Sequence, residues 1–299
     1  MNLKERVLET IKRRKERLLN GSINSIPSPF TRFSDDFIGI EQGKYYVVTS
    51  TTKGAKTQFA SFVFVFNALL YAYHNPDKLR IKIFYYPLEE TPEDIMIRFM
   101  SFLLYTISKG NIRIAPIDIL STKNSKPVDD YILEMLNTKE YDDIIKFFEE
   151  NIIFSAATNP TGVYKECKDY AEANGTVYTR EQIIKDEFTN KEKVIHVFDH
   201  YEQTDPDEYR IIFYDHVSLT STEKNILTLK AAIDKLSEYM VILRNRYKFT
   251  PVVIQQQAFA GESLDAFKEN KLRPTIANLS DSKYPSRDKP NIFVIMLHI

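Results

Sequence analysis

The chain has 299 residues, of which 43% are hydrophobic and 27% are charged, and it contains 8 glycines and 13 prolines. This composition is typical of a globular protein and excludes a disordered chain or a collagen-like repeat. The formal net charge is −1, so the chain as a whole has no positive field that would attract nucleic acid from a distance. Its single cysteine, Cys167, excludes an internal disulfide and fits a reducing compartment.

The first 26 residues are predicted to form an amphipathic helix and a linker, and residues 27–299 are predicted to form the main domain. Apolar residues recur at helical spacing over residues 3–19. The segment "NGSINSIPSPF" (residues 20–30) is a linker by its Gly, Ser and Pro content. The helix is either a solvated terminal helix or a helix that docks on a neighbouring subunit. No secretory signal is visible, because charged residues occur throughout the N-terminus.

The first half of the main domain alternates between predicted strands and helices. Strand "KYYVVTS" (44–50) precedes a polar loop and an apolar helix (59–73), and strand "RIKIFYY" (80–86) precedes a helix that Thr91 caps. The apolar helix is shorter than the roughly 20 residues of a membrane span, so we interpret it as a buried helix and expect no membrane contact. The order of these elements predicts an α/β fold with a mostly parallel, twisted sheet flanked by helices.

The second half continues this pattern around two insertions. Residues 124–150 are predicted to be an extra helical segment, and residues 174–209 an irregular surface insertion. The remaining predicted elements are strand 151–156, helix 160–173, strand 210–215, helix 221–247, strand 250–257 and strand 291–297.

The segment "TSTTKGAKTQF" (residues 49–59) stands where a phosphate-binding loop would stand in such a fold. The usual loop reads G-x-x-x-x-G-K-[ST], and its glycines let backbone N–H groups surround a polyphosphate. Lys56 and Thr57 match its last two positions, whereas Ser50 and Ala55 replace the glycines. The segment is either a divergent phosphate loop or a polar turn before a helix. As a phosphate loop, it would bind nucleotide through Ser50, Thr51, Thr52, Lys53, Gly54, Ala55, Lys56, Thr57 and Gln58.

Nucleotide hydrolysis in such a fold needs several groups together at the ends of adjacent strands. Thr57 and Asp215 are the candidate Mg²⁺ ligands, a hydroxyl and a carboxylate. Glu89 is the candidate general base, Lys56 the candidate phosphate contact, and Gln257 the candidate sensor of the γ-phosphate. Each residue alone has an ordinary explanation as a loop lysine, a strand-end acid or a first-turn carboxylate. Their order on successive strands favours a shared catalytic site.

Asp199, in "VIHVFDH", also follows apolar residues and competes with Asp215 for the metal role. We prefer Asp215, because its strand leads through a long helix to the strand that ends in Gln257, which completes a β-α-β unit. His200 and His216 have no cysteines at zinc-ligand spacing. We therefore interpret both histidines as structural or surface residues.

Five segments together resemble the ATPase domain of the DnaB-type replicative DNA helicases, in the RecA-like P-loop superfamily. They cover roughly residues 27–110, 150–173 and 210–298 and occur in the family's order. The segments are "IPSPFTRFSDDFIGIEQGKYYVV", "YYPLEETPEDIMIRFMS" with its Glu89 and Arg98, "RIIFYDHVSLTS", "TPVVIQQQ" and "LRPTIANLSDS".

The resemblance implies a hexameric ring that hydrolyses ATP with Mg²⁺ at subunit interfaces and moves along single-stranded DNA during replication. It gives Lys56, Thr57, Glu89, Asp215 and Gln257 the roles stated above, with Gln257 coupling the γ-phosphate to DNA-binding loops. It further implies the cytoplasm of a bacterial or phage-infected cell and other replication proteins as partners.

The comparison with this family gives further expectations. Lys268, Lys271 and Arg273 are candidate contacts to the DNA strand. The family's N-terminal helical domain has no counterpart here, and the chain ends in an apolar strand, before the family's basic finger. We therefore expect a longer natural protein and slow ATP hydrolysis by this chain. The alternatives to a helicase are a RecA-like regulatory or loader ATPase without unwinding activity and a degenerate nucleotide-binding scaffold.

Overall fold

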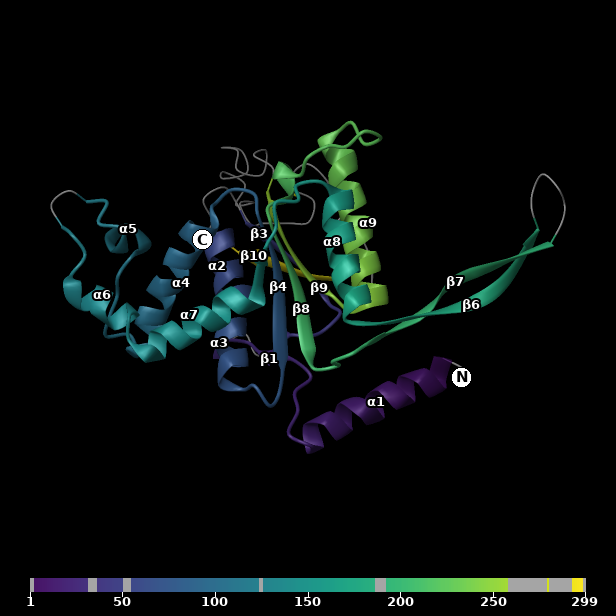
Figure 1. Cartoon of the computed structure of the whole chain (residues 1–299), viewed down its shortest axis with the longest axis horizontal. Helices are drawn as coiled ribbons and strands as arrows, with labels where there is room; N and C mark the ends of the chain where they lie inside the picture. Colours follow the sequence, from purple (N-terminus) through teal and green to yellow (C-terminus); the bar gives the residue numbers. More distant parts are fainter. Residues whose placement is uncertain are drawn as a thin grey trace, which may run out of the picture.

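The computed structural model describes residues 3–31, 37–50, 55–123, 126–185, 192–257, 279 and 292–297 (Figure 1). Within these ranges the centre of the molecule is a six-stranded sheet in which every neighbouring pair of strands is parallel. The predicted α/β fold with a parallel sheet is confirmed. In order across the sheet, the strands are β10 (Ile292–Leu297), β3 (Tyr45–Ser50), β9 (Thr250–Gln256), β8 (Glu208–Asp215), β4 (Arg80–Pro87) and β5 (Ile152–Phe154).

The sheet is buried on both faces, so its strands are nearly continuous runs of apolar residues. Successive side chains of β3 point to opposite sides: Tyr46 and Val48 belong to one apolar core, and Tyr45 and Val47 to the other. The first core is covered by α2 (Lys56–Ser61), a π-helical segment (Phe62–Phe66), α3 (Asn67–His74), α4 (Pro92–Ile107) and α7 (Lys139–Asn151). The second is covered by α8 (Pro160–Ala173) and α9 (Leu229–Tyr247).

The C-terminal ends of the central strands lie at one edge of the sheet, the upper edge in Figure 1. Ser50 at the end of β3 is in register with Gln256 of β9, and Asp215 at the end of β8 is in register with Pro87 of β4. The segments that follow these four strands therefore start side by side. Open parallel sheets bind ligands at this edge.

The predicted helical insertion at 124–150 contains α6 (Asp130–Leu136) and most of α7, and the short α5 (Pro116–Ile119) precedes it. Helix α4 begins as predicted, because Thr91 and Asp94 form a reciprocal capping box. Within the described residues, no helix is long and apolar enough to cross a membrane.

The segment 174–209 differs from the prediction of an irregular insertion. It forms a long antiparallel hairpin of β6 (Gly175–Lys185) and β7 (Glu192–Gln203), which projects from the body of the molecule (Figure 1). Most side chains on both faces of this hairpin are exposed. Without a buried face, the sequence has no strict alternation of apolar and polar residues, and the usual strand signal is missing.

The predicted helix 221–247 begins later than expected. Helix α9 starts at Leu229, where the side chain of Thr228 accepts a hydrogen bond from the N–H of Ala231. Before it lie a short 3₁₀ turn (Val217–Leu219) and a bridge between Glu223 and Ile226. The Thr228 cap therefore decides where the helix begins.

The N-terminal helix α1 (Leu3–Leu19) lies across the lower edge of the sheet in Figure 1 and contacts the domain through polar groups. Arg14 forms an ion pair with Glu41, and Arg17 forms one with Asp207 and also donates to the carbonyl of Ile23. The apolar residues of α1 are largely exposed: Leu3, Val7, Leu8, Ile11, Leu18 and Leu19.

A two-residue strand pair fixes the chain between α1 and the sheet. Strand β1 (Ile26–Pro27) pairs with β2 (Gly39–Ile40). Gly39 has φ +133°, and a Cβ atom there would lie 1.9 Å from the carbonyl oxygen of Ile26, so this position requires glycine. The pairing leads directly into Glu41, the partner of Arg14.

Candidate nucleotide-binding site

Thr57 and Asp215, the two predicted Mg²⁺ ligands, are in contact at the upper edge of the sheet. The hydroxyl of Thr57, in the first turn of α2, donates to Oδ1 of Asp215 at 3.2 Å. Asp215 ends β8 and is 2% exposed. Mg²⁺ in phosphate-transfer sites is held by one or two carboxylates together with substrate phosphates. A hydroxyl beside a buried carboxylate fits that requirement.

The carboxyl group of Asp215 is strongly affected by its surroundings. Burial raises its pKa from 3.8 to about 7, because ionisation inside the protein lacks solvation. The hydrogen bond from Thr57 and the charge of Arg98 lower this pKa, whereas the charges of Glu89 and Glu90 raise it. A bound cation would favour the ionised form in the same way that Arg98 does.

Glu89 follows β4 and forms a hydrogen bond with His216, the residue after Asp215. Nε2 of His216 lies 2.8 Å from Oε1 of Glu89. His216 is 6% exposed, and its Nδ1 accepts a hydrogen bond from the N–H of Ser218 at 3.2 Å. From the sequence we interpreted His216 as a structural or surface residue and did not predict this contact. Its position directly after Asp215 is the signal in the sequence that could have revealed it.

Gln257 lies immediately after β9, against the end of β3. Its Nε2 donates to Oγ1 of Thr49 at 2.8 Å, and its backbone N–H donates to the carbonyl of Ser50 at 3.1 Å. The side chain is buried, and its Oε1 has no hydrogen-bond partner among the described residues. Buried amide oxygens usually have a donor, so this oxygen is available to a ligand or a water molecule at the site.

Arg98 of α4 is a further cation beside the site. It forms an ion pair with Glu90, and its charge acts on Asp215. Nε and Nη1 of Arg98 are buried and have no hydrogen-bond partner among the described residues. Two unpartnered guanidinium donors at this edge fit an anionic ligand, such as a phosphate group.

The structure describes the two ends of the predicted phosphate loop. Ser50 is a buried, extended residue of β3, and the left-handed conformation occurs instead at Ala55, with φ 50°. Lys56, partly buried, is the first residue of α2, and Gln58 is exposed. Four predicted loop residues lie outside the described part of the chain: Thr51, Thr52, Lys53 and Gly54.

Other predicted residues lie elsewhere. Asp199 is on the projecting strand β7, with its side chain 45% exposed and 2.7 Å from Nδ1 of His200. It is therefore not part of the cluster around Thr57. The predicted DNA contacts Lys268, Lys271 and Arg273 lie outside the described residues.

Of the comparisons with known proteins, the one with solved structures identifies the fold. No protein-family model matches the chain, and no curated protein sequence matches it. A solved structure of a DnaB-like replicative helicase, described with its interactions with primase, matches with a TM-score of 0.58 over 98% of this chain at 13% identity. The chain therefore shares its fold with part of that solved structure. It spans 56% of the length of that solved chain.

Proposed function

We propose that this chain is an ATPase domain of the DnaB-like helicase type, which hydrolyses ATP with Mg²⁺ and couples hydrolysis to movement along single-stranded DNA. The observation that carries the proposal is that four residues come together at one edge of the sheet, each at the end of a different strand or just after it: Thr57, Asp215, Glu89 and Gln257. Catalysis of phosphoryl transfer depends mainly on positioning and on charge stabilisation, which such a convergence supplies.

Each residue would have a definite task. Lys56, at the N-terminal end of α2, would contact the phosphates, which a helix N-terminus also favours. Thr57 and Asp215 would hold Mg²⁺, which neutralises phosphate charge when bound. Glu89 would orient and deprotonate the attacking water, and Gln257 would contact the γ-phosphate.

The helicase role further requires assembly and DNA. We propose a homo-hexameric ring inside the cell, with single-stranded DNA in its centre, by analogy with the family that the sequence resembles. The exposed apolar residues of α1 recur along one helix and support a contact between subunits, since contiguous exposed apolar patches often mark protein–protein interfaces.

ATP turnover with and without single-stranded DNA tests the proposal. We expect DNA-stimulated turnover, which Lys56→Ala abolishes and Glu89→Gln lowers by about 10²–10⁴-fold. Glu93→Gln is the matched control, because Glu93 is an exposed carboxylate four residues further on. ATP turnover that single-stranded DNA does not stimulate would favour a regulatory ATPase, and absence of nucleotide binding would favour a scaffold. Either result would contradict the helicase proposal.

A further inference from the structure

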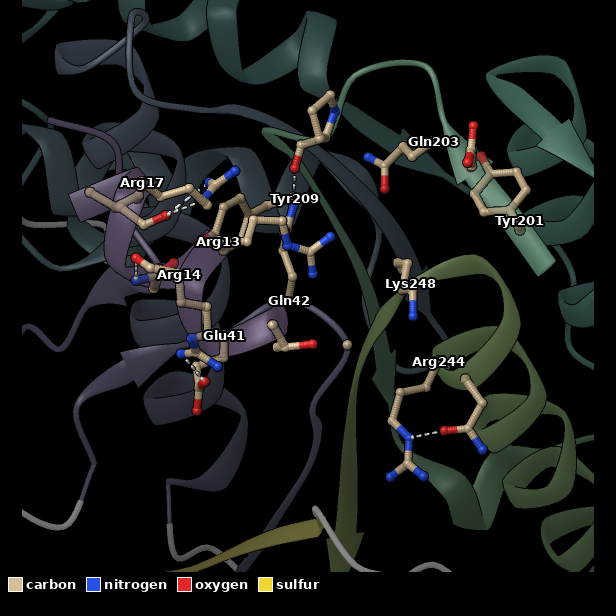
Figure 2. Close-up of a pocket in the computed structure, with 17 residues that line it drawn as sticks. Arg13, Arg14, Arg17, Glu41, Gln42, Tyr201, Gln203, Tyr209, Arg244 and Lys248 are labelled. Carbon is tan, nitrogen blue, oxygen red and sulfur yellow. Dashed lines mark hydrogen bonds and ion pairs between the residues drawn. The ribbon is translucent and has the colours of Figure 1, made fainter. Parts of the chain in front are cut away.

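A second concave site lies at the opposite edge of the sheet, where the strands begin. It has a volume of about 600 Å³ and is enclosed by α1, the residues before β3, the turn between β7 and β8, and the C-terminal end of α9 (Figure 2). None of its lining residues belongs to the candidate nucleotide site described above. The charged residues that line it therefore need a separate explanation.

Positive charge is concentrated in this pocket. Five cationic side chains line it, against the carboxylates of Glu41 and Glu202. In Figure 2 the three arginines of α1 stand on one side of the hollow, and the two cations of α9 and its C-terminal cap stand on the other. The five are Arg13, Arg14, Arg17, Arg244 and Lys248.

Two of these cations are not neutralised within the described chain. Arg14 is paired with Glu41 at 2.7 Å, and Arg17 with Asp207 at 2.6 Å. The side chains of Arg13 and Lys248 form no hydrogen bond or ion pair with any described residue. They also lie close enough for the charge of Arg13 to act on Lys248, and burial together with this charge lowers the pKa of Lys248. Both residues are exposed, so water screens part of the repulsion between them, and an anion between the two cations would remove more of it.

The backbone fixes the position of Lys248. It ends α9 with φ 65°, and its N–H donates to the carbonyl of Leu243. Glycine is the usual residue in this left-handed position, because other residues are strained there. A cation near a helix C-terminus is also stabilised by the helix dipole, but Arg244 and Arg246 already stand in the last turn. The dipole alone therefore does not require a lysine at the strained position.

We propose that this pocket binds a small molecule that carries a diphosphate group, held between Arg13 of α1 and Lys248 at the end of α9. Guanidinium and ammonium groups are the side chains that bind phosphate, and two unpaired cations match a ligand with at least two negative charges. The net charge of the whole chain is −1, so the chain as a whole would not attract a nucleic acid, and five cations line this one hollow. That distribution favours a small anion over a nucleic-acid backbone.

Binding would connect α1 to the body of the domain. No described side chain of α1 is fully buried, and its contacts with the domain are polar. A diphosphate between Arg13 and Lys248 would add a charged link across the hollow. The inference does not depend on ATP hydrolysis, because it concerns the opposite edge of the sheet and a binding measurement tests it.

The test is calorimetric titration of the full chain with inorganic pyrophosphate, in the Lys56→Ala background so that the candidate phosphate loop contributes little. We expect one bound pyrophosphate per chain, and a loss of affinity of roughly tenfold or more in Arg13→Ala and in Lys248→Ala. Lys12→Ala with Lys15→Ala is the matched control, because it removes two exposed cations of α1 that do not line the pocket. We also expect pyrophosphate to slow amide hydrogen exchange in α1.

Several results would overturn the proposal. Equal affinity in Lys248→Ala, Arg13→Ala and the control double variant would place the anion elsewhere. Equal binding of sulfate at the same ionic strength would show an adventitious ion only. If pyrophosphate does not bind and single-stranded DNA binds less well to Arg13→Ala and Lys248→Ala, the surface is a nucleic-acid contact instead. Circular dichroism of each variant would show that the fold is retained.

Discussion

His216 holds the carboxylate of Glu89 through a hydrogen bond of 2.8 Å between Nε2 and Oε1. Because Nδ1 of His216 accepts from the N–H of Ser218, the neutral ring carries its proton on Nε2 and donates it to Glu89. The imidazole is buried, whereas 45% of the Glu89 side chain is exposed. A buried residue thus fixes the orientation of the carboxylate that we propose as the general base.

The first prediction concerns this contact. We expect His216→Ala to lower kcat for ATP by about 10- to 100-fold, because partners that orient a reactive group contribute on this scale. KM is expected to change little, since His216 is proposed to contact Glu89 and not the nucleotide. His216→Gln, whose amide can donate from a similar position, is expected to retain most of the activity. Steady-state kinetics of both variants would measure kcat and KM for ATP.

His200→Ala is the matched control, because His200 is exposed on the projecting hairpin. If His216→Ala and His200→Ala have the same kcat, the contact with Glu89 has no catalytic role. A thermal melt of His216→Ala would separate loss of positioning from loss of folded protein.

The second prediction concerns Mg²⁺ and pH. Since the pKa of Asp215 is about 7, its carboxyl group is mostly protonated below that pH and must lose a proton to bind a cation. We expect the affinity for Mg²⁺–nucleotide to rise up to about tenfold per pH unit below pH 7 and to level off above it. The phosphates of the nucleotide titrate in the same pH range. The contribution of Asp215 is therefore the difference between the affinity profiles of the wild type and Asp215→Asn. Asp199→Asn serves as control and is expected to follow the wild type.

Fluorescence titration with a labelled nucleotide, from pH 5.5 to 8, would provide these profiles. Superimposable profiles for the wild type and Asp215→Asn would show that Asp215 is not a metal ligand. A loss of Mg²⁺-dependent binding in Asp199→Asn alone would transfer the metal role to the other acid.

The third prediction concerns stability, and it does not depend on any nucleotide. The folded-state pKa of Asp215 is raised above its unfolded value of 3.8, so the folded protein retains a proton that the unfolded chain releases. The resulting stabilisation is complete below 3.8 and is lost as pH rises through about 7. Between pH 5.5 and 8, the wild type should lose about 2 kcal/mol more unfolding free energy than Asp215→Asn. Urea denaturation of both proteins at the two pH values measures this difference, and equal losses would contradict it.

The fourth prediction concerns Ala55, which adopts a left-handed conformation at the glycine position of the phosphate loop. This conformation costs a non-glycine residue about 1–2 kcal/mol, and part of that strain is offset by the greater freedom of glycine in the unfolded chain. We expect Ala55→Gly to raise the free energy of unfolding by about 1 kcal/mol. Ala60→Gly, in the buried interior of α2, should instead lower it by about 1 kcal/mol. Thermal melts compare the two; destabilisation of similar size in both would show that Ala55 is not strained.

Much of the fold was predictable because strands buried on both faces have a strong sequence signal. Every residue of β3, Tyr45 to Ser50, is buried, and the run of apolar residues predicts such a strand. The hairpin β6–β7 lacks that signal, because solvent contacts both of its faces. Its regularity comes from backbone pairing between segments that the sequence alone does not align.

The candidate site was predictable in part. Strand ends in a parallel sheet meet at one edge, so the proximity of Thr57 and Asp215 followed from the order of elements. The contact between His216 and Glu89 joins residues 127 positions apart, and only the packed structure shows which ring nitrogen faces which oxygen. The basic pocket was likewise not predictable, because its cations come from α1 and from the end of α9, which are far apart in the sequence.

The last prediction concerns the projecting hairpin. In the described part of the hairpin, the distal cross-strand pair Ile183 and Val194 is 65% and 54% exposed. The proximal part packs against the domain, where Phe198 contacts the ring of Tyr247. Deleting residues 180–197 and joining Thr179 to Phe198 through Asn-Gly should therefore change the free energy of unfolding by less than about 1 kcal/mol, because Asn-Gly suits a two-residue hairpin turn. Phe198→Ala, which removes a partly buried ring, should cost about 1–3 kcal/mol. Urea denaturation of both variants provides the comparison, and a larger loss in the deletion than in Phe198→Ala would mean that the distal hairpin supports the fold.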